Sequence, residues 1–228
     1  MLRVKTESII YKLISYSDRS AIGYVLSKDF GIIKVFISSA YNKKGGVFKF
    51  IPGLMDIRYK ENGALHKFYN FEHYVSYSYF IDNPYVFARL NVIFFLLQEY
   101  HIDDYSYLWK LLLNINEQNI YKSFIYITHY LLNSSGYFPE MKCVMCEKTD
   151  NLYIGNDLNI KCVDCKTENF LKIGEDLIKL FEDIHNKEVF KKVFIGRELE
   201  KKYVSFLKYF VENNLNRKIK VFEFFDMI

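Results

Sequence analysis

The sequence predicts an α+β protein in which five short strands form a β-barrel at the N-terminus, followed by helices with a four-cysteine ribbon inserted between them. Three observations carry this prediction. The first seventy residues contain short β-branched and aromatic runs that are bounded by turn residues. From about residue 83 onward, apolar residues recur at helical spacing. The four cysteines form two Cys-x-x-Cys pairs, which fifteen residues separate.

The five predicted strands are rich in Ile, Val, Tyr and Phe, and they cover residues 8–14, 21–26, 32–38, 54–59 and 65–71. Residues 27–31 join two of these runs as a short hairpin, and Asn62-Gly63 predicts a type I′ turn in which both residues have positive φ. Short antiparallel strands in this number suit a small closed barrel of the OB type. We therefore expect a nucleic-acid-binding domain at residues 1–78 and a helical domain at residues 79–228.

Helices are predicted at about residues 84–100, 105–113, 118–133, 174–186 and 197–215. Asn83 followed by Pro84 is typical of a helix start, because an asparagine side chain caps the first N–H groups and proline suits the first helical position. Gly136 suits the left-handed residue that ends the third helix. The ribbon, at about residues 139–168, interrupts the helical region.

The cysteines predict one structural Zn²⁺ ion held by Cys143, Cys146, Cys162 and Cys165. Each pair places two thiolates on one side of a tight turn, and the linker is long enough to complete a tetrahedron. Four thiolates leave no coordination position for water or substrate, so the ion would not be catalytic. Disulfide bonds are the alternative. No signal peptide opens the sequence, which favours a cytoplasmic location where thiols stay reduced.

Several functional classes lack their sequence signals. The most apolar stretch, residues 92–97, is far shorter than the ~20 residues that cross a bilayer, so we expect no membrane span. The sequence has no P-loop, no Gly-x-Ser-x-Gly elbow and no His-Glu-x-x-His pair. Asp29-Phe30-Gly31 matches the kinase metal-binding triplet, but without the other kinase motifs it is a hairpin turn. We therefore predict that the protein is not an enzyme and binds no nucleotide.

Positive charge is concentrated in the N-terminal third. Residues 1–70 carry twelve basic and five acidic side chains, whereas the whole chain has a net charge of +4. Such a surface attracts phosphate backbones regardless of sequence, and a solvated sheet surface is the alternative interpretation. A predicted loop at residues 39–46 carries two of the candidate contacts and can close over a strand. The candidate nucleic-acid contacts are Lys43, Lys44, Lys49, Arg3, Lys5, Arg19 and Lys34.

This order of parts resembles the bacterial recombination mediator family RecO over nearly the whole chain. The most specific match is Gly-Tyr-Phe-Pro-Glu-Met at residues 136–141, which is similar to the family's lead-in to its first cysteine pair. Residues 29–34 are similar to a hairpin between early strands of the family, and residues 214–220 are similar to its closing segment. The resemblance implies an N-terminal OB barrel, a helical body and a four-cysteine zinc site.

The resemblance also implies a function. Members of the family are mediators of DNA repair and homologous recombination that bind single- and double-stranded DNA, anneal complementary strands, and help load recombinase at gaps. Their partners are RecR and the C-terminal tail of the single-stranded-DNA-binding protein, and an acidic tail needs a basic rim on the helical body. Lys122 and Arg217 are our candidates for that rim.

Two alternatives remain open. A zinc-ribbon OB-fold protein of transcription or translation, which binds RNA or DNA, would have the same barrel and metal. A nuclease or modifying enzyme should instead show convergent carboxylates or a nucleophile with a base, and the basic barrel shows neither. For the position of the DNA contacts, as distinct from the functional class, the alternative is the C-terminal basic cluster of Arg217, Lys218 and Lys220.

Overall fold

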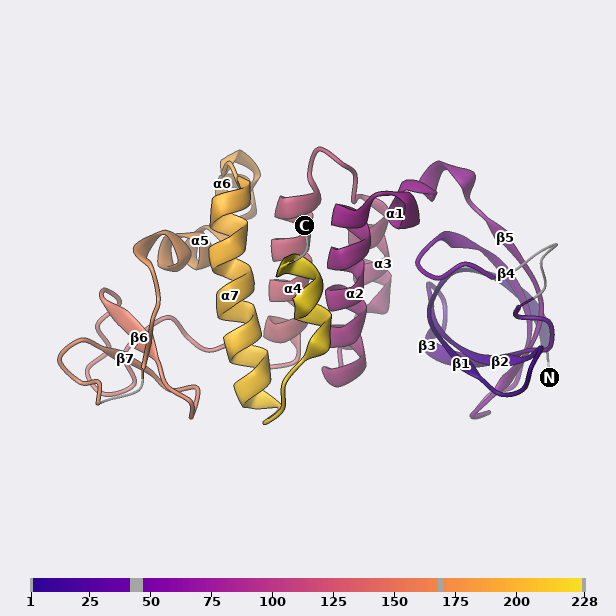
Figure 1. Ribbon diagram of the computed structural model, residues 1–228, viewed down its shortest axis with the longest axis horizontal. Helices are drawn as coiled ribbons and strands as arrows, with labels where there is room; N and C mark the ends of the chain where they lie inside the picture. The colour runs from indigo at the N-terminus through magenta and orange to yellow at the C-terminus, as the bar shows by residue number, and fades with distance from the viewer. Residues whose placement is uncertain (1, 42–46, 168–169, 227–228) are drawn as a thin grey trace. The chain divides into compact units, whose positions relative to one another are not determined.

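The computed structural model of the protein describes residues 2–41, 47–167 and 170–226 (Figure 1). The chain divides into two compact units, Met1–Gln118 and Asn119–Ile228. The first unit contains the barrel and helices α1 to α3, and the second contains the cysteine ribbon and helices α4 to α7. The predicted α+β class is therefore confirmed.

Within the described residues, the first unit contains a closed five-stranded barrel with the strand order β1-β2-β3-β5-β4. Neighbouring strands are antiparallel except β3 and β5, which pair in parallel at Val35–His66 and Phe36–Lys67. The first half of β1 pairs with β4 and its second half with β2, which closes the barrel. The strands are β1 (Leu2–Ser15), β2 (Ala21–Ser27), β3 (Gly31–Ile37), β4 (Pro52–Tyr59) and β5 (His66–His73).

Alternation along the strands fills the barrel interior. In β3, Ile33, Val35 and Ile37 are buried, while Lys34 between them is exposed. This burial pattern alternates because successive side chains of a strand point to opposite faces. The core of the barrel is formed by Ile10, Ala21, Val25, Ile33, Val35, Ile37, Ala40, Met55, Ile57 and Phe71.

Two local predictions for the barrel need correction. β1 begins at Leu2 rather than at residue 8, because Leu2–Ile9 pair with β4 although their side chains are largely polar. The type I′ turn at Asn62-Gly63 is also wrong, since Asn62 has a φ of 57° but Gly63 does not have a positive φ. Residues 60–65 form a longer connection, in which the Gly63 N–H donates to the Lys60 carbonyl at 2.9 Å, so the two-residue hairpin geometry is not required.

The helices of the first unit pack against the barrel. The predicted cap is confirmed, because the Asn83 side chain accepts hydrogen bonds from the N–H groups of Tyr85 and Val86. Phe94 of α2 stacks on Tyr11 at 5.1 Å and on Phe50 at 5.4 Å between ring centroids. The compact unit Met1–Gln118 therefore contains these helices together with the barrel. Its helical elements are η1 (Val75–Tyr77), α1 (Tyr79–Asp82), α2 (Pro84–Glu99) and α3 (Tyr105–Leu113).

The second unit has its own helical core. The Thr128 hydroxyl of α4 and the Tyr203 hydroxyl of α7 lie 2.8 Å apart in a buried hydrogen bond. Gly136 has a φ of 75° beyond the end of α4, as predicted for the left-handed residue. The short helices α6 and η2 were not predicted. The helical elements are α4 (Ile120–Ser134), α5 (Glu175–His185), α6 (Lys187–Lys192), α7 (Arg197–Asn214) and η2 (Lys220–Asp226).

The described part of the chain contains no single helix with both the length and the apolar composition to cross a membrane. One bent pair, Val75–Asp82 with Pro84–Glu99, meets those requirements jointly, with an angle of 89° between its two parts. In the structure, most of the apolar side chains of α2 are buried. Its hydrophobic residues are thus part of a protein core.

Candidate metal centre and nucleic-acid surface

The cysteine ribbon is built on very short strands, which are ordered β7-β6-β8 in a three-stranded sheet within the described residues. In the first Cys-x-x-Cys turn, the Cys143 N–H donates to the Lys148 carbonyl, and the Glu147 N–H donates to the Cys143 carbonyl, both at 2.8 Å. The Val144 N–H donates to the Ile160 carbonyl at 2.9 Å, which ties this turn to β7. The strands are β6 (Leu152–Ile154), β7 (Ile160–Cys162) and β8 (Leu171–Lys172).

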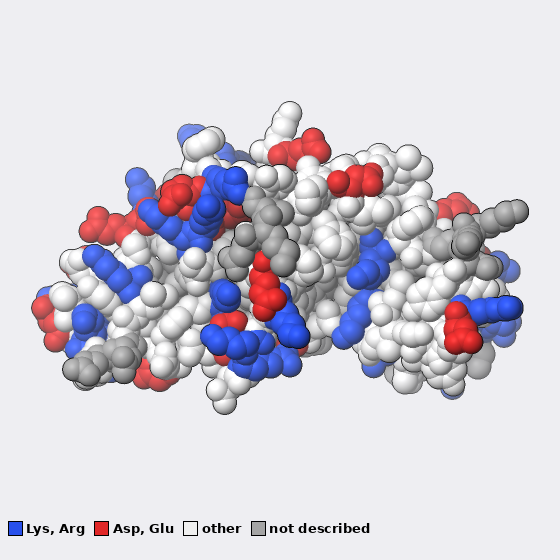
Figure 2. Space-filling model, viewed as in Figure 1, with Lys and Arg blue, Asp and Glu red and all other residues white. Residues whose placement is uncertain are grey.

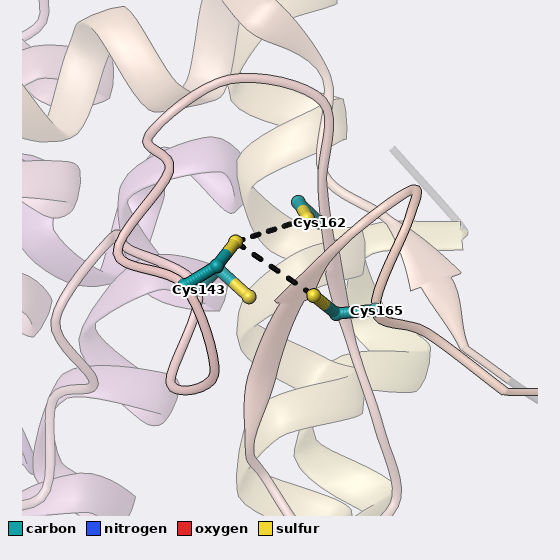
Figure 3. A group of neighbouring side chains, drawn as sticks. Cys143, Cys162 and Cys165 are labelled. Atoms are coloured by element: carbon teal, nitrogen blue, oxygen red, sulfur yellow. Dashed lines mark hydrogen bonds between the residues drawn. The ribbon is translucent and has the colours of Figure 1, made fainter.

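The second turn brings the remaining two sulfur atoms to the first pair. Cys162 ends β7, and the Cys165 N–H donates back to the Cys162 carbonyl at 3.1 Å. Figure 3 shows the sulfur atoms of Cys143, Cys162 and Cys165 turned toward a common space. All four Sγ atoms lie within 4.8 Å of one another, and that of Cys146 is 3.6 Å from Cys162 and 3.7 Å from Cys165. The four cysteines therefore form one cluster that is compatible with a metal site.

All four cysteines are free thiols in the structure, which disagrees with the alternative that they form disulfide bonds. Burial raises the pKa of the Cys143 thiol, but backbone hydrogen bonds from Cys162, Met145 and Cys146 outweigh burial and lower that pKa to about 6. Hydrogen bonds to the neighbouring thiols of Cys146 and Cys162 raise the pKa of Cys165 to about 12. Thiols this close compete for ionisation, and a bound metal ion removes that competition because it deprotonates its ligands.

The segment before the ribbon is anchored in the helical core of the second unit. After the left-handed Gly136, the Phe138 N–H donates to the Leu132 carbonyl at 3.1 Å. The Phe138 ring lies 4.3 Å from the His129 ring and 5.1 Å from the Phe181 ring, measured between centroids. The Gly-Tyr-Phe-Pro sequence thus has a structural reason, since the glycine turns the chain and the phenylalanine docks it.

The predicted nucleic-acid contacts are distributed over the barrel. Lys43 and Lys44 lie outside the described residues. Lys5 and Lys34 are exposed on β1 and β3, Arg19 is exposed in the β1–β2 loop, and Lys49 is exposed in the β3–β4 loop. Arg3 is also exposed, although its guanidinium donates to Asp56. The described candidates are therefore on the surface, but they do not form a single cluster.

Sequence reasoning missed a row of cations that crosses three strands. Arg3 of β1 pairs with Arg58 of β4, which pairs with Lys67 of β5, and all three side chains are exposed. Residues directly opposite on neighbouring strands share a face, and like charges in that arrangement destabilise a sheet. Asp56 offsets part of this repulsion: its carboxylate accepts from Arg3 Nε at 3.0 Å and Nη2 at 2.7 Å, which lowers the pKa of Asp56. We call Arg3, Arg58 and Lys67 the cation row, and an anion bound there would relieve its repulsion.

A second group of basic and aromatic side chains spans β1, β2 and β3, whereas the cation row spans β1, β4 and β5. Tyr24 of β2 pairs with Lys12 of β1 and Lys34 of β3. The Nζ atoms of the two lysines are 5.2 and 5.1 Å from the Tyr24 ring centroid. Lys12 also donates to Gln98 Oε1 of α2 at 3.0 Å, so this group borders the surface where the helix packs. This group and the cation row both depend on the strand register, which pairs residues that are distant in the sequence. Neither could therefore be predicted from the sequence.

The two candidates for the partner-binding rim lie on different elements of the second unit. Lys122 of α4 donates to the Lys191 carbonyl at 2.9 Å, and Arg217 follows α7. Figure 2 shows lysine and arginine side chains mixed with acidic ones over α6 and α7. A hollow of about 430 Å³ in this unit is lined by neither candidate; its lining includes Leu177, Phe206, Lys172, Lys201 and Lys202.

Neither a scan against models of protein families nor a search of curated proteins found a match for this chain. What the protein does is therefore inferred from the cysteine cluster and the barrel surface.

Proposed function

We propose that the four-cysteine cluster holds one structural Zn²⁺ ion. A zinc–thiolate bond is about 2.3 Å long, so neighbouring sulfur atoms of a tetrahedral site lie about 3.8 Å apart. The distances of 3.6 and 3.7 Å from Cys146 to Cys162 and Cys165 fit this spacing. Four thiolates complete the coordination shell of zinc, which supports a role in holding the ribbon together and none in catalysis.

The barrel is, in our proposal, an OB-type barrel that binds nucleic acid. Its strand order, with β1 shared between β2 and β4, suits the five-stranded Greek-key barrel of that fold. OB barrels bind oligonucleotides on strands 2 and 3 and on the loops that follow strands 1 and 4. Lys34 on β3 and Arg19 in the β1–β2 loop occupy such positions. The cation row adds side chains that can contact the phosphates of a nucleic acid of any sequence.

The function that these features support best is that of a mediator of DNA repair and recombination, as the resemblance to the RecO family implies. The observation that carries this proposal is the combination, in one chain, of a basic five-stranded barrel, helices, and a four-cysteine cluster between α4 and α5. Such a protein binds single- and double-stranded DNA in the cytoplasm and helps load recombinase at gaps together with RecR. Its cations bring complementary strands together by reducing phosphate repulsion, which requires no nucleotide.

The tail of the single-stranded-DNA-binding protein, in this proposal, docks on the second unit. The hollow of about 430 Å³ offers apolar side chains of Leu177 and Phe206 beside three lysines, which suits an acidic tail with an apolar end. Lys202 is paired with Asp176 at 2.6 Å, so tail binding there would exchange one carboxylate partner for another. This hollow fits the tail better than Lys122 and Arg217, which do not line it.

A zinc-ribbon protein of transcription or translation that binds RNA or DNA is the second candidate. The cation row supports this second candidate as much as it supports the mediator, because phosphate contacts carry no sequence information. The two functions differ in the step after binding: a mediator accelerates the pairing of complementary strands, whereas a binding module of transcription or translation has no need to.

A strand-annealing assay separates the two candidates. We expect the protein to accelerate annealing of complementary DNA oligonucleotides equally with and without ATP, and to act on strands coated with the single-stranded-DNA-binding protein. No acceleration over protein-free annealing would remove the mediator function and leave the second candidate, which a comparison of RNA and DNA affinities then tests. Equal rates on strands coated with the intact or the tailless binding protein would remove tail docking alone.

A further inference from the structure

A hollow lies in the barrel wall where β3 and β5 part. Among the described residues these strands are paired only at Val35–His66 and Phe36–Lys67. Beyond the paired positions there is a hollow of about 350 Å³, lined by the end of β3, part of the β3–β4 loop, and β5. This volume falls at the small end of the range of about 300–1,000 Å³ that is usual for small-molecule sites. We call this hollow the β3–β5 pocket.

Aromatic rings line the pocket. The Phe48 side chain is 53% exposed, and its ring meets the His73 ring edge-on at 5.3 Å between centroids. His73 in turn packs edge-on against Phe71 at 4.6 Å, which holds it in place from the barrel side. Tyr69 also lines the pocket. Exposed aromatic rings are stacking platforms for nucleobases of any identity, because every base has a flat π face.

Polar groups in the same pocket suit the edge of a base. The Phe48 N–H donates to His73 Nε2 at 3.2 Å, so the imidazole is neutral and carries its proton on Nδ1. Asn70, Ser38 and Ser39 also line the pocket and are exposed. Together they offer both hydrogen-bond donors and acceptors, which a base edge requires and a purely apolar ligand does not.

Tyr69 joins the pocket to the cation row. Its ring centroid lies 4.6 Å from Arg3 Cζ and 5.4 Å from Lys67 Nζ. Arg58 stands between these two cations in the strand register. A phosphate backbone that follows the row therefore passes beside the opening of an aromatic pocket.

We propose that the β3–β5 pocket binds one unstacked base of a single strand while the cation row contacts the flanking phosphates. The proposal rests on nucleic-acid binding by the barrel, as proposed above. A base in a duplex is stacked and paired, and must be extruded at a cost before it can enter a pocket. The pocket therefore gives the barrel a preference for single strands, which the cation row by itself does not supply.

The test compares Phe48→Ala with the unmodified full-length, zinc-loaded protein, using fluorescence anisotropy of a labelled single strand and of the matching duplex. Loss of one stacking platform should weaken single-strand binding roughly fivefold or more and leave duplex binding unchanged. Phe48→Trp should keep the single-strand affinity, because tryptophan also stacks. Phe194→Ala is the matched control: this phenylalanine is 88% exposed in the second unit, and its loss should change neither affinity.

A strand that carries 5-iodouracil gives an independent measurement, since irradiation should crosslink it to Phe48 or Tyr69 and the duplex should give no such crosslink. An equal loss of single-strand and duplex affinity in Phe48→Ala would overturn the base pocket while leaving nucleic-acid binding intact. Unchanged affinity for both would also overturn it, and would make a side chain of a protein partner the occupant to test. If the unmodified protein binds neither nucleic acid, the proposed function itself fails.

Discussion

The barrel and the cysteine ribbon are both β structures, but different interactions hold them together. Strands β1 to β5 contain 7 to 14 residues each and enclose an apolar core. The ribbon strands contain only two or three residues, and Cys143 and Cys162 are among its buried side chains. So small a sheet buries too little apolar surface to be stable without a cross-link. The barrel thus has an apolar core of its own, and we expect the ribbon to depend on a metal ion held by its cysteines.

Breaking the cysteine cluster should have the largest effect. Structural zinc binds with an apparent free energy of about 10–16 kcal/mol, and that energy is folding energy for a site of this kind. We expect one zinc ion per chain, and we expect Cys162→Ser to lose it and unfold the ribbon while the barrel stays folded. Metal analysis under reducing conditions and hydrogen exchange measure the two effects.

The matched control for that change is Val163→Ser, an exposed position in the same turn, which should keep both the zinc and the protection of the ribbon. Purified protein without zinc whose ribbon amides remain protected would contradict a structural metal. Barrel amides that lose protection together with the ribbon would show that the two regions are not independently stabilised.

A core substitution in the barrel should show the opposite pattern. Met55 is fully buried in the barrel core, and Met55→Ala should lower the free energy of unfolding of the first unit by about 2–5 kcal/mol. Leu54→Ala, at the neighbouring half-buried position, should cost less. Denaturant titration followed by both intrinsic fluorescence and a zinc-sensitive dye measures this. If Met55→Ala also lowered the denaturant concentration at which zinc is released, the barrel and the ribbon would not be independently stabilised.

Acid should weaken the second unit through His129. Burial, together with the nearby His185, lowers the pKa of His129 to about 4, and neither ring nitrogen has a hydrogen-bond partner among the described residues. The unfolded chain, with a histidine pKa of about 6.5, therefore binds a proton before the folded chain does. The stability that the neutral ring contributes is complete above pH ~6.5 and falls by about 3 kcal/mol as the pH drops toward 4.

The variant that isolates this effect is His129→Phe, which keeps an aromatic ring beside Phe138 and removes the titration. Zinc release in acid affects both proteins alike, so the difference between their unfolding free energies reports His129. We expect that difference to change in favour of His129→Phe as the pH falls from about 6.5 to about 4.5, and a constant difference would contradict the buried neutral histidine.

The smallest effect on folding, and the sharpest on binding, should come from the surface cations. Log affinity falls as log salt rises, and Arg58→Ala with Lys67→Ala should make this negative slope shallower by about 0.7–0.9 for each phosphate that the protein no longer binds. The double substitution should not reduce stability. Lys43→Ala with Lys44→Ala should act in the same direction. Lys218→Ala with Lys220→Ala is the matched control in the second unit. A slope that changes only in the control would move the DNA site to the C-terminal basic cluster.

Much of the fold could be predicted from local sequence signals, which depend only on residues that are close together in the chain. The helix start at Asn83, the left-handed Gly136 and the strand β3 were all predicted, since each depends on a few adjacent residues. The polar first half of β1 was missed because its place in the sheet comes from pairing with β4 and not from its own composition. The ribbon strands were missed because two or three residues carry no periodic signal.

The sequence by itself determined which residues form the four-cysteine cluster, since the spacing of two Cys-x-x-Cys pairs constrains the sulfur atoms before any tertiary contact is known. It also determined that the N-terminal third is basic and β-rich. Only the tertiary structure decided that Arg3, Arg58 and Lys67 form one row, and that the β3–β5 pocket opens beside that row. The physical reason is that register and barrel closure join residues far apart in the chain, and a shift of one residue would turn each of these side chains to the other face.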